Sequence, residues 1–383
     1  MNTFRIKQFQ GKLRRTVQSI DKSGSLLGYW DQHKPAKALL PTELLESAEK
    51  IRIDWPANLK KPLVGLVQEN FEIYAYWPVY QRFLANNAIP FEYYDVHRSD
   101  FAECAKKFDL ILWHTQSSPS ALAEARSKIE FLEKSLGKLC YPSADDLWFY
   151  EDKARQFWLF EKNQLPVVKT FVSYSKAEAL QYIKSCSYPI VSKEITNSSS
   201  HGVSLLKTPR QAKSFCNQAF SSGINTSFNY ARQKDYVYFQ EFVPNYGYDL
   251  RVIMAAGSYF GYYRYPAAGD FRASGSGDVR KELIPEEALL LAQKVREALR
   301  CSRFLAVDLI RDRRDDCYYI IEASIFIQVK TSEQLKVDGV PGRFQFENGA
   351  FKFLPGRFWV QELVLQDLMN EWIEANETRQ KFP

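Results

Sequence analysis

The sequence predicts a protein whose first part is a parallel α/β domain and whose remainder is α+β. From Leu63 onward, short apolar runs alternate with amphipathic segments, which is the pattern of parallel strands joined by helices. Beyond residue 145, apolar runs also pair through short turns. The clearest pair is 304–310 and 317–327, because both runs are rich in β-branched and aromatic residues and the intervening 311–316 is fully charged.

Length and composition indicate an ordinary globular protein. With 383 residues, 45% hydrophobic and 25% charged, the chain is long enough for two or three packed domains. Its six cysteines form no CxxC pair and no zinc-like spacing, which favours reduced thiols in a cytoplasmic protein. No apolar run approaches the roughly 18 residues that span a bilayer, so we expect no integral membrane segment. The net charge of +6 is mild and the basic residues do not gather in one tract, so nucleic acid is not an expected partner.

Residues 1–60 show no sustained hydrophobic period and are predicted to form an extended or partly helical arm. Basic residues lie near its start: Arg5, Lys7, Lys12, Arg14 and Arg15. They suit either a solvated tail or attachment to an anionic membrane surface. Attachment normally needs a hydrophobic partner or a denser cluster, which favours the tail.

Residues 61–144 follow the order βαβαβαβ, which predicts a small parallel sheet. Ligands of such sheets bind beyond the carboxyl ends of the strands. The polar residues at those positions are Gln68, Glu69, Asn70, His114, Thr115 and Gln116. His114 is a candidate to hold a substrate, but a lone histidine at a strand end is more often a hydrogen-bonded structural residue.

A long amphipathic helix is predicted over 145–163, then a strand over 167–172 and a helix opened by Ser175. The next apolar strand contains Lys193, whose buried ammonium group needs a partner. Glu194 cannot serve, because adjacent strand residues face opposite sides of a sheet. A nucleotide phosphate would supply the missing partner.

A loop of small polar residues, 197–202, separates that strand from a further strand and a helix beginning at Pro209. The buried strand YVYFQEFV follows. Next come a hairpin that turns at 256–258 and a flexible loop, GDFRASGSGD, which bears one arginine, Arg272.

Each run of the charged hairpin contains one carboxylate at its centre, Asp308 in the first and Glu322 in the second. If the turn is centred near Asp315, the two acids lie opposite each other with Cβ atoms about 4.5–5.5 Å apart. Two carboxylates that close in an apolar setting repel each other unless one is protonated or a cation lies between them. A divalent metal is one explanation. The alternative is that one acid faces solvent or pairs with an arginine.

Taken together, these motifs resemble the ATP-grasp superfamily, and within it the RimK-like carboxylate–amine ligases. The motifs occur in the family's order within residues 60–370: KARQFWLF, PIVSKE, the small-residue loop with HGV, QEFV, YDLRV, FRASGSG, AVDLI and IIEAS. The resemblance implies an N-terminal arm followed by a pre-ATP-grasp α/β domain and two α+β lobes that enclose ATP. We assign these parts to residues 1–60, 61–144, 145–243 and 244–383.

The resemblance also implies how the phosphates are held. Lys153 and Lys193 match the two lysines that reach the phosphates in the family. The small-residue loop would close over the β- and γ-phosphates with its backbone N–H groups. Its implied phosphate-binding residues are Ser199, Ser200, His201 and Gly202, and it has one glycine where the family usually has two or three.

The base and the ribose have implied partners in the strand YVYFQEFV and in the hairpin after it. The backbone of Glu241, Phe242 and Val243 would hydrogen-bond the adenine edge. Asp249 would accept hydrogen bonds from the ribose hydroxyls. The nucleotide site is therefore expected to draw on both lobes.

For the metal, the resemblance implies that Asp308 and Glu322 bind Mg²⁺, which would bridge phosphate oxygens and neutralise developing charge. The family's metal motif usually ends E-x-N, whereas here the third ligand would be the hydroxyl of Ser324, a weaker donor.

Three arginines, Arg272, Arg264 and Arg251, match cations that hold the acceptor carboxylate and the acyl phosphate in the family. The guanidinium fork suits such oxyanions. A surface salt bridge would satisfy any one of them equally well.

The implied function is an ATP-dependent ligase, in which Mg²⁺-ATP phosphorylates a small-molecule carboxylate and an amine attacks the acyl phosphate to form an amide. The GDFRASGSG loop and the E-x-S ending are similar to ATP-grasp proteins associated with polysaccharide assembly, which favours a sugar acid as one substrate. Two alternatives stay open: a small-molecule or sugar kinase on the same fold, and a nucleotide-binding scaffold without turnover. Among protein partners, a second copy of the chain in a homodimer is the candidate.

Overall fold

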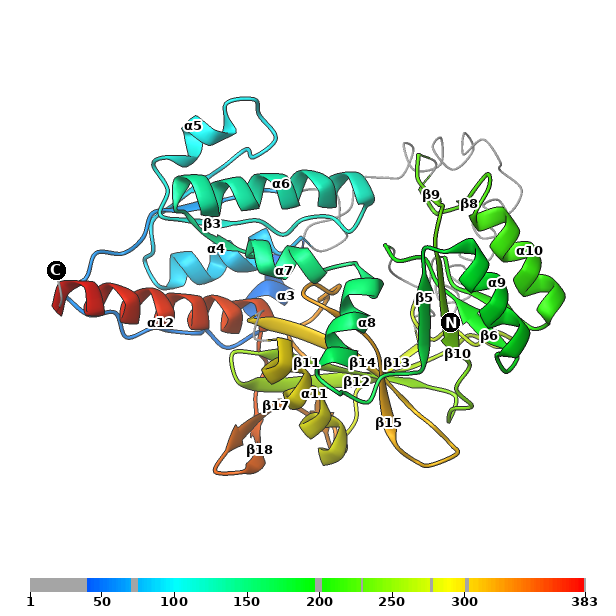
Figure 1. The fold of residues 1–383 in the computed structure, drawn as a ribbon. Helices are drawn as coiled ribbons and strands as arrows, with labels where there is room; N and C mark the ends of the chain where they lie inside the picture. The colour runs from blue at the N-terminus through cyan, green and yellow to red at the C-terminus, as the bar shows by residue number, and fades with distance from the viewer. Residues whose placement is uncertain are drawn as a thin grey trace.

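The computed structural model describes residues 40–69, 75–196, 202–228, 230–275, 278–299 and 303–381. Figure 1 shows a parallel-sheet domain with the long helix α6, a lobe with helices α9 and α10 on the opposite side, and a large antiparallel sheet below them. Within the described ranges, every helix is too short or too polar to cross a membrane.

The N-terminal domain is a four-stranded parallel sheet, as the alternation predicted. Its strands, in the order β2-β1-β3-β4, are β2 (Phe91–Tyr93), β1 (Val64–Leu66), β3 (Leu110–Leu112) and β4 (Leu139–Tyr141). Its helices are α4 (Trp77–Asn86), α5 (Phe101–Ala105) and α6 (Pro119–Leu136). Every residue of β1 and β3 is buried, which explains why these strands are continuously apolar.

The described end of the N-terminal arm is packed against the protein, so the expected solvated tail does not extend this far. Helix α3 (Thr42–Glu46) is followed by the buried Ile51. The indole N–H of Trp359 donates to the carbonyl of Leu45 at 2.9 Å, which ties the arm to the C-terminal part of the chain. The basic residues near the start of the arm lie outside the described residues: Arg5, Lys7, Lys12, Arg14 and Arg15.

The single helix predicted over 145–163 is in fact two helices, α7 (Ala144–Phe149) and α8 (Lys153–Lys162). Between them, Glu151 has a φ of 51°, a left-handed conformation that an α-helix cannot contain. The carboxylate of Asp152 then accepts the N–H of Arg155 at 3.0 Å and caps the second helix. The break therefore sets Lys153 at the first position of α8.

The first lobe is a four-stranded antiparallel sheet. Its strands, in the order β5-β10-β6-β7, are β5 (Thr170–Ser173), β10 (Val237–Glu241), β6 (Ile190–Ser192) and β7 (Ser204–Leu206). Helices α9 (Lys176–Ser185) and α10 (Pro209–Ala219) pack on it, and β8 (Ile224–Asn225) and β9 (Arg232–Gln233) form a separate ribbon. Strand β5 begins later than predicted, because Val167 bridges to Ile320 of the second lobe.

The second lobe is an eight-stranded antiparallel sheet. Its main path is β15-β14-β11-β12-β17-β16, with β13 on β12 and β18 on β17. The bounds are β11 (Asp249–Ala255), β12 (Ser258–Tyr265), β13 (Asp278–Arg280), β14 (Phe304–Arg311), β15 (Tyr318–Ser324), β16 (Lys336–Val337), β17 (Val340–Glu347) and β18 (Ala350–Pro355). Helix α11 (Glu286–Leu299) packs on this sheet, and α12 (Val360–Lys381) packs on α4. The divisions at residues 60, 144 and 243 remain predictions.

The charged hairpin β14–β15 has the predicted register, with Asp308 opposite Glu322. The next pair is Leu309 with Ile320, so Ile321 is an extra residue in β15 and forms a β-bulge. Side chains alternate between the two faces of a regular strand, but the bulge lets both Ile321 and Glu322 face the same pocket. The bulge is thus what brings the second carboxylate to the side of the first.

Candidate active site

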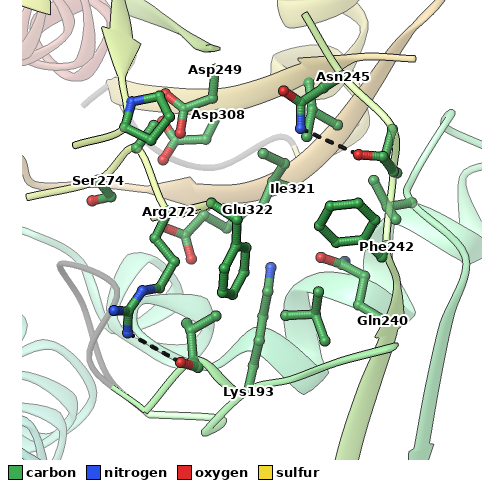
Figure 2. Close-up of a pocket in the computed structure, with 18 of the residues that line it drawn as sticks. Lys193, Gln240, Phe242, Asn245, Asp249, Arg272, Ser274, Asp308, Ile321 and Glu322 are labelled. Atoms are coloured by element: carbon green, nitrogen blue, oxygen red, sulfur yellow. Dashed lines mark hydrogen bonds between the residues drawn. The ribbon is translucent and has the colours of Figure 1, made fainter. Parts of the chain in front are cut away.

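A pocket lies between the two lobes, with strands of the first lobe on one side and the charged hairpin on the other (Figure 2). It gathers many of the residues predicted from the sequence: Lys153, Lys193, Glu241, Phe242, Val243, Asp249, Arg264, Arg272, Asp308 and Glu322. Gly202, Arg251 and Ser324 do not line it. The predictions for Ser199, Ser200 and His201 lie outside the described residues.

Lys193 follows the end of β6 and is only 6% exposed. Figure 2 shows its nitrogen pointing into the middle of the pocket. Within the described part of the chain, its ammonium group has neither a hydrogen bond nor a salt bridge. Burial lowers the pKa of Lys193 to about 8. A buried cation without a partner is the arrangement that an anionic ligand would complete.

Lys153 approaches the same space from the start of α8. Its Nζ lies 3.6 Å from Oε2 of Glu322. Burial disfavours the charge of Lys153, but the nearby carboxylates of Glu322 and Glu151 outweigh it and raise the pKa of the lysine. Glu151 itself is buried, and burial raises its pKa to about 7. Nothing in the sequence marked Glu151, since its position depends on the break between α7 and α8.

Asp308 is held by two arginines in this structure. The guanidinium of Arg251 donates to both of its oxygens, at 2.6 and 2.7 Å, and that of Arg264 donates to Oδ2 at 2.7 Å. Burial alone would raise the pKa of Asp308, but the two arginines hold it well below the usual range. The arginine alternative considered from the sequence is therefore the arrangement present here.

Arg264, one of these two arginines, also bonds Asp249. The guanidinium of Arg264 donates to both oxygens of Asp249, at 2.6 and 3.0 Å. Asp249 is 8% exposed, and burial raises its pKa despite the arginine. Its predicted role with the ribose would therefore require sharing this carboxylate with Arg264.

Two carboxylates that could bind a metal, Asp308 and Glu322, lie on one wall of this pocket. Within the described residues, no three His, Cys, Asp or Glu side chains are arranged to hold an ion on their own. Glu322 is the more accessible acid and bonds to no arginine among the described residues, whereas Asp308 is engaged by Arg251 and Arg264. The hydroxyl of Ser324 donates to the carbonyl of Phe326 at 2.6 Å. The donor set suits Mg²⁺ where phosphate oxygens supply the remaining ligands.

Arg272 lies in the loop after β12 and reaches across to the first lobe. Its guanidinium donates to both oxygens of Asp270 at 2.9 Å and to the carbonyl of Val203 at 3.3 Å. The neighbouring Phe271 contacts Phe242 edge to face, with ring centroids 6.2 Å apart. The loop thus covers the pocket with one cation and one aromatic ring.

Gln240 is a pocket residue that the sequence analysis did not single out. The hydroxyl of Thr170 donates its one hydrogen to the carbonyl of Val168 at 2.6 Å, so toward Gln240, 3.1 Å away, it can only accept. The amide nitrogen of Gln240 must therefore face Thr170, and its oxygen is left as an acceptor facing the pocket (Figure 2). A buried glutamine in a strand otherwise rich in aromatic residues was the available signal.

His114 is a structural residue, as the alternative interpretation held. It stacks on Tyr76 with ring centroids 3.9 Å apart and meets Phe326 at 4.6 Å, and it does not line the pocket. Complete burial lowers its pKa to about 3, so it stays neutral. After the neighbouring strand β1, the carboxylate of Glu69 accepts the indole N–H of Trp113 at 2.8 Å.

Comparison with known proteins gives one family match and several shared folds. Residues 150–339 match the RimK-like ATP-grasp domain. The alpha-aminoadipate–LysW ligase LysX of Saccharolobus solfataricus is 27% identical over 198 residues, which are 50% of this chain and 67% of that ligase.

Two solved structures align with a TM-score of 0.50. A RimK domain ATP-grasp protein of Sphaerobacter thermophilus is 16% identical, over 68% of this chain and 90% of its own. The D-cycloserine synthetase DcsG is 14% identical, over 69% and 91% respectively. These two show the ATP-grasp fold, which the sequence predicted.

The unpartnered Lys193 leads to a prediction about protons. A bound phosphate would stabilise its charged form, so at pH 9, above its pKa of about 8, ATP binding should take up a proton, and at pH 7 it should take up far less. Titration calorimetry in buffers of different ionisation enthalpy measures that uptake. Lys193→Met should abolish it and should weaken ATP more than adenosine. Undiminished uptake in the variant would assign the proton to another group.

Proposed function

Because residues 150–339 form a RimK-like ATP-grasp domain, we propose that this ATP-dependent ligase joins a small-molecule carboxylate to an amine. ATP and Mg²⁺ are its cofactors. The observation that supports the proposal best is the buried ammonium of Lys193, which has no salt bridge or hydrogen bond among the described residues and points into a pocket whose other end offers an acceptor for a nucleobase. A triphosphate would complete the charge at one end, and adenine would occupy the other.

The reaction proceeds in two steps. The substrate carboxylate attacks the γ-phosphorus, ADP leaves, and an acyl phosphate forms. The amine then attacks the acyl carbon, phosphate leaves, and after loss of a proton an amide remains. The protein needs no covalent nucleophile, since alignment and stabilisation of charge are enough in a closed site.

The side chains divide this work between the two lobes. Lys153 and Lys193 hold the phosphates, and Arg264 and Arg272 hold the carboxylate and then the acyl phosphate. Arg251 keeps Asp308 charged and in place. Mg²⁺, when bound, would neutralise charge on the phosphate oxygens, and Glu322 and Asp308 would hold it, with Ser324 as the third candidate.

Two classes of substrate are candidates for this site. The loop around Arg272 and the E-x-S ending favour a sugar acid in polysaccharide biosynthesis. The likeness to LysX, whose name states that it ligates α-aminoadipate and LysW, favours an amino acid as one partner. Both classes fit a pocket in which arginines receive a carboxylate.

ADP release with panels of acids and amines tests the proposal. We expect release to depend on an acid and an amine together, and we expect acid with hydroxylamine to give a hydroxamate, because hydroxylamine captures acyl phosphates. In Arg272→Lys, which keeps the charge but loses the fork, turnover should fall by at least about 100-fold while ATP affinity changes little. Release with an alcohol alone would indicate a kinase instead. Tight ATP binding without turnover would indicate a scaffold.

Gln240 gives a prediction about the base. An acceptor at this position suits the 6-amino group of adenine and opposes the 6-oxo group of hypoxanthine, so ITP should bind at least about tenfold more weakly than ATP, as expected for a buried unsatisfied acceptor. Thr170→Val frees the amide to rotate and should bring the two affinities close together. The measurement is calorimetry of both nucleotides with both proteins. Equal binding of ATP and ITP by the wild type would contradict the assignment.

A further inference from the structure

The charged turn 311–316 at the tip of the β14–β15 hairpin is bound to the chain that follows β10, at the junction of the two lobes. The backbone N–H of Arg313 donates to the carbonyl of Pro244 at 2.8 Å. Asn245 and Asp312 form an isolated antiparallel bridge. These contacts fasten the turn to the chain that follows the carboxyl end of β10. The base is proposed to bind at that strand end.

Arg314 adds a side-chain link at the same place. Its Nε donates to Asp312 at 2.9 and 3.0 Å, and its Nη2 donates to the same carboxylate, which fixes the plane of the guanidinium. Its Nη1 then donates to the carboxylate of Glu241. Asp312 is 2% exposed, so the fork is anchored on a buried acid rather than on a mobile surface group.

Glu241 is the last residue of β10 and lines the pocket. Its backbone N–H donates to the carbonyl of Lys169 at 2.9 Å, so one side of this strand end is held by β5. On its other side Glu241 pairs with Ile190 of β6, and its side chain is held by Arg314. The strand end is therefore clamped between its own sheet and the hairpin of the other lobe.

We propose that Arg314 is a positioning residue for the nucleotide base, which it aligns by holding Glu241 and the backbone of 241–243. The inference rests on the proposed function, because it takes ATP as the ligand. One hairpin then sets both ends of the site: its strands carry Asp308 and Glu322 toward the phosphates, and its turn carries Arg314 toward the adenine edge.

An ordinary surface ion pair would contribute little, and the side chains of Arg314 and Glu241 are 52% and 30% exposed. Two results separate positioning from simple charge compensation: the response of a ligand without charge, and the response to a lysine that keeps the charge. Arg313 provides the matched control. It is the adjacent arginine, and its backbone N–H donates to Pro244 while its guanidinium lies over Tyr246.

The experiment is calorimetric titration of the wild type, Arg314→Ala, Arg314→Lys and Arg313→Ala with adenosine and with Mg²⁺-ATP, together with thermal unfolding. We expect Arg314→Ala to weaken both ligands by a similar factor, about tenfold, because a displaced strand edge is felt by the base that both ligands share. Arg314→Lys should not restore binding, since one ammonium cannot replace the fork. Arg313→Ala should bind like the wild type and melt within about 2 °C of it. Without ligand, Arg314→Ala should melt lower than the wild type, because the buried Asp312 loses its guanidinium partner.

Three outcomes would overturn the inference: unchanged binding in Arg314→Ala, weakening of ATP without weakening of adenosine, or full rescue by lysine. The first would make the pair a surface contact, and the other two would make it charge compensation. A wild-type protein that binds neither ligand would overturn the proposed function and this inference with it. Normal wild-type binding with an unaffected Arg314→Ala would overturn this inference alone.

Discussion

The burial of Asp308 is the constraint on which the rest of the site depends. A carboxylate that is 2% exposed must be paired, and Arg251 and Arg264 pair it with short bonds to both oxygens. Arg264 also bonds Asp249, so both arginines pair with acids of their own sheet through Nε and Nη2, and within the described part of the chain Nη1 of Arg264 remains for the proposed substrate carboxylate. Lys193, on the opposite lobe, receives no such acid among the described residues. Phosphates would supply the missing negative charge.

The hairpin that carries Asp308 also sets the geometry of the pocket. The bulge at Ile321 brings Glu322 to the same side as Asp308, and the turn beyond reaches Pro244, at the junction of the two lobes. Backbone pairing, backbone hydrogen bonds and the link from Arg314 to Glu241 therefore determine the span between the proposed adenine edge and the acids. The same logic applies to Gln240, whose amide is oriented by a threonine hydroxyl that has no hydrogen left to give.

Those parts of the fold and the site that depend on local sequence pattern could be predicted from the sequence. Alternating apolar runs predicted the parallel sheet, and the placement of Asp308 and Glu322 about Asp315 predicted that these two acids pair. The rest of the hairpin is centred between Arg314 and Asp315, and the bulge, which was not predicted, restores that pairing. The break at Glu151 could not be predicted, because the amphipathic pattern of the sequence continues through it. The helix nevertheless ends there, since Glu151 adopts a left-handed backbone conformation. Nor could the arginine partners of Asp308, since pairing between strands far apart in sequence depends on the sheet order.

The most direct test compares Asp308→Asn with Glu322→Gln in thermal unfolding, each with and without Mg²⁺-ATP. Asp308→Asn strands buried guanidinium groups and should cost about 3–5 kcal/mol of stability without ligand. Glu322→Gln removes a part-exposed acid 3.6 Å from a lysine and should stay within about 1 kcal/mol of the wild type, while losing the rise in melting temperature that Mg²⁺-ATP gives. A Glu322→Gln protein that melts far below the wild type and keeps the full ligand-induced rise would contradict this account.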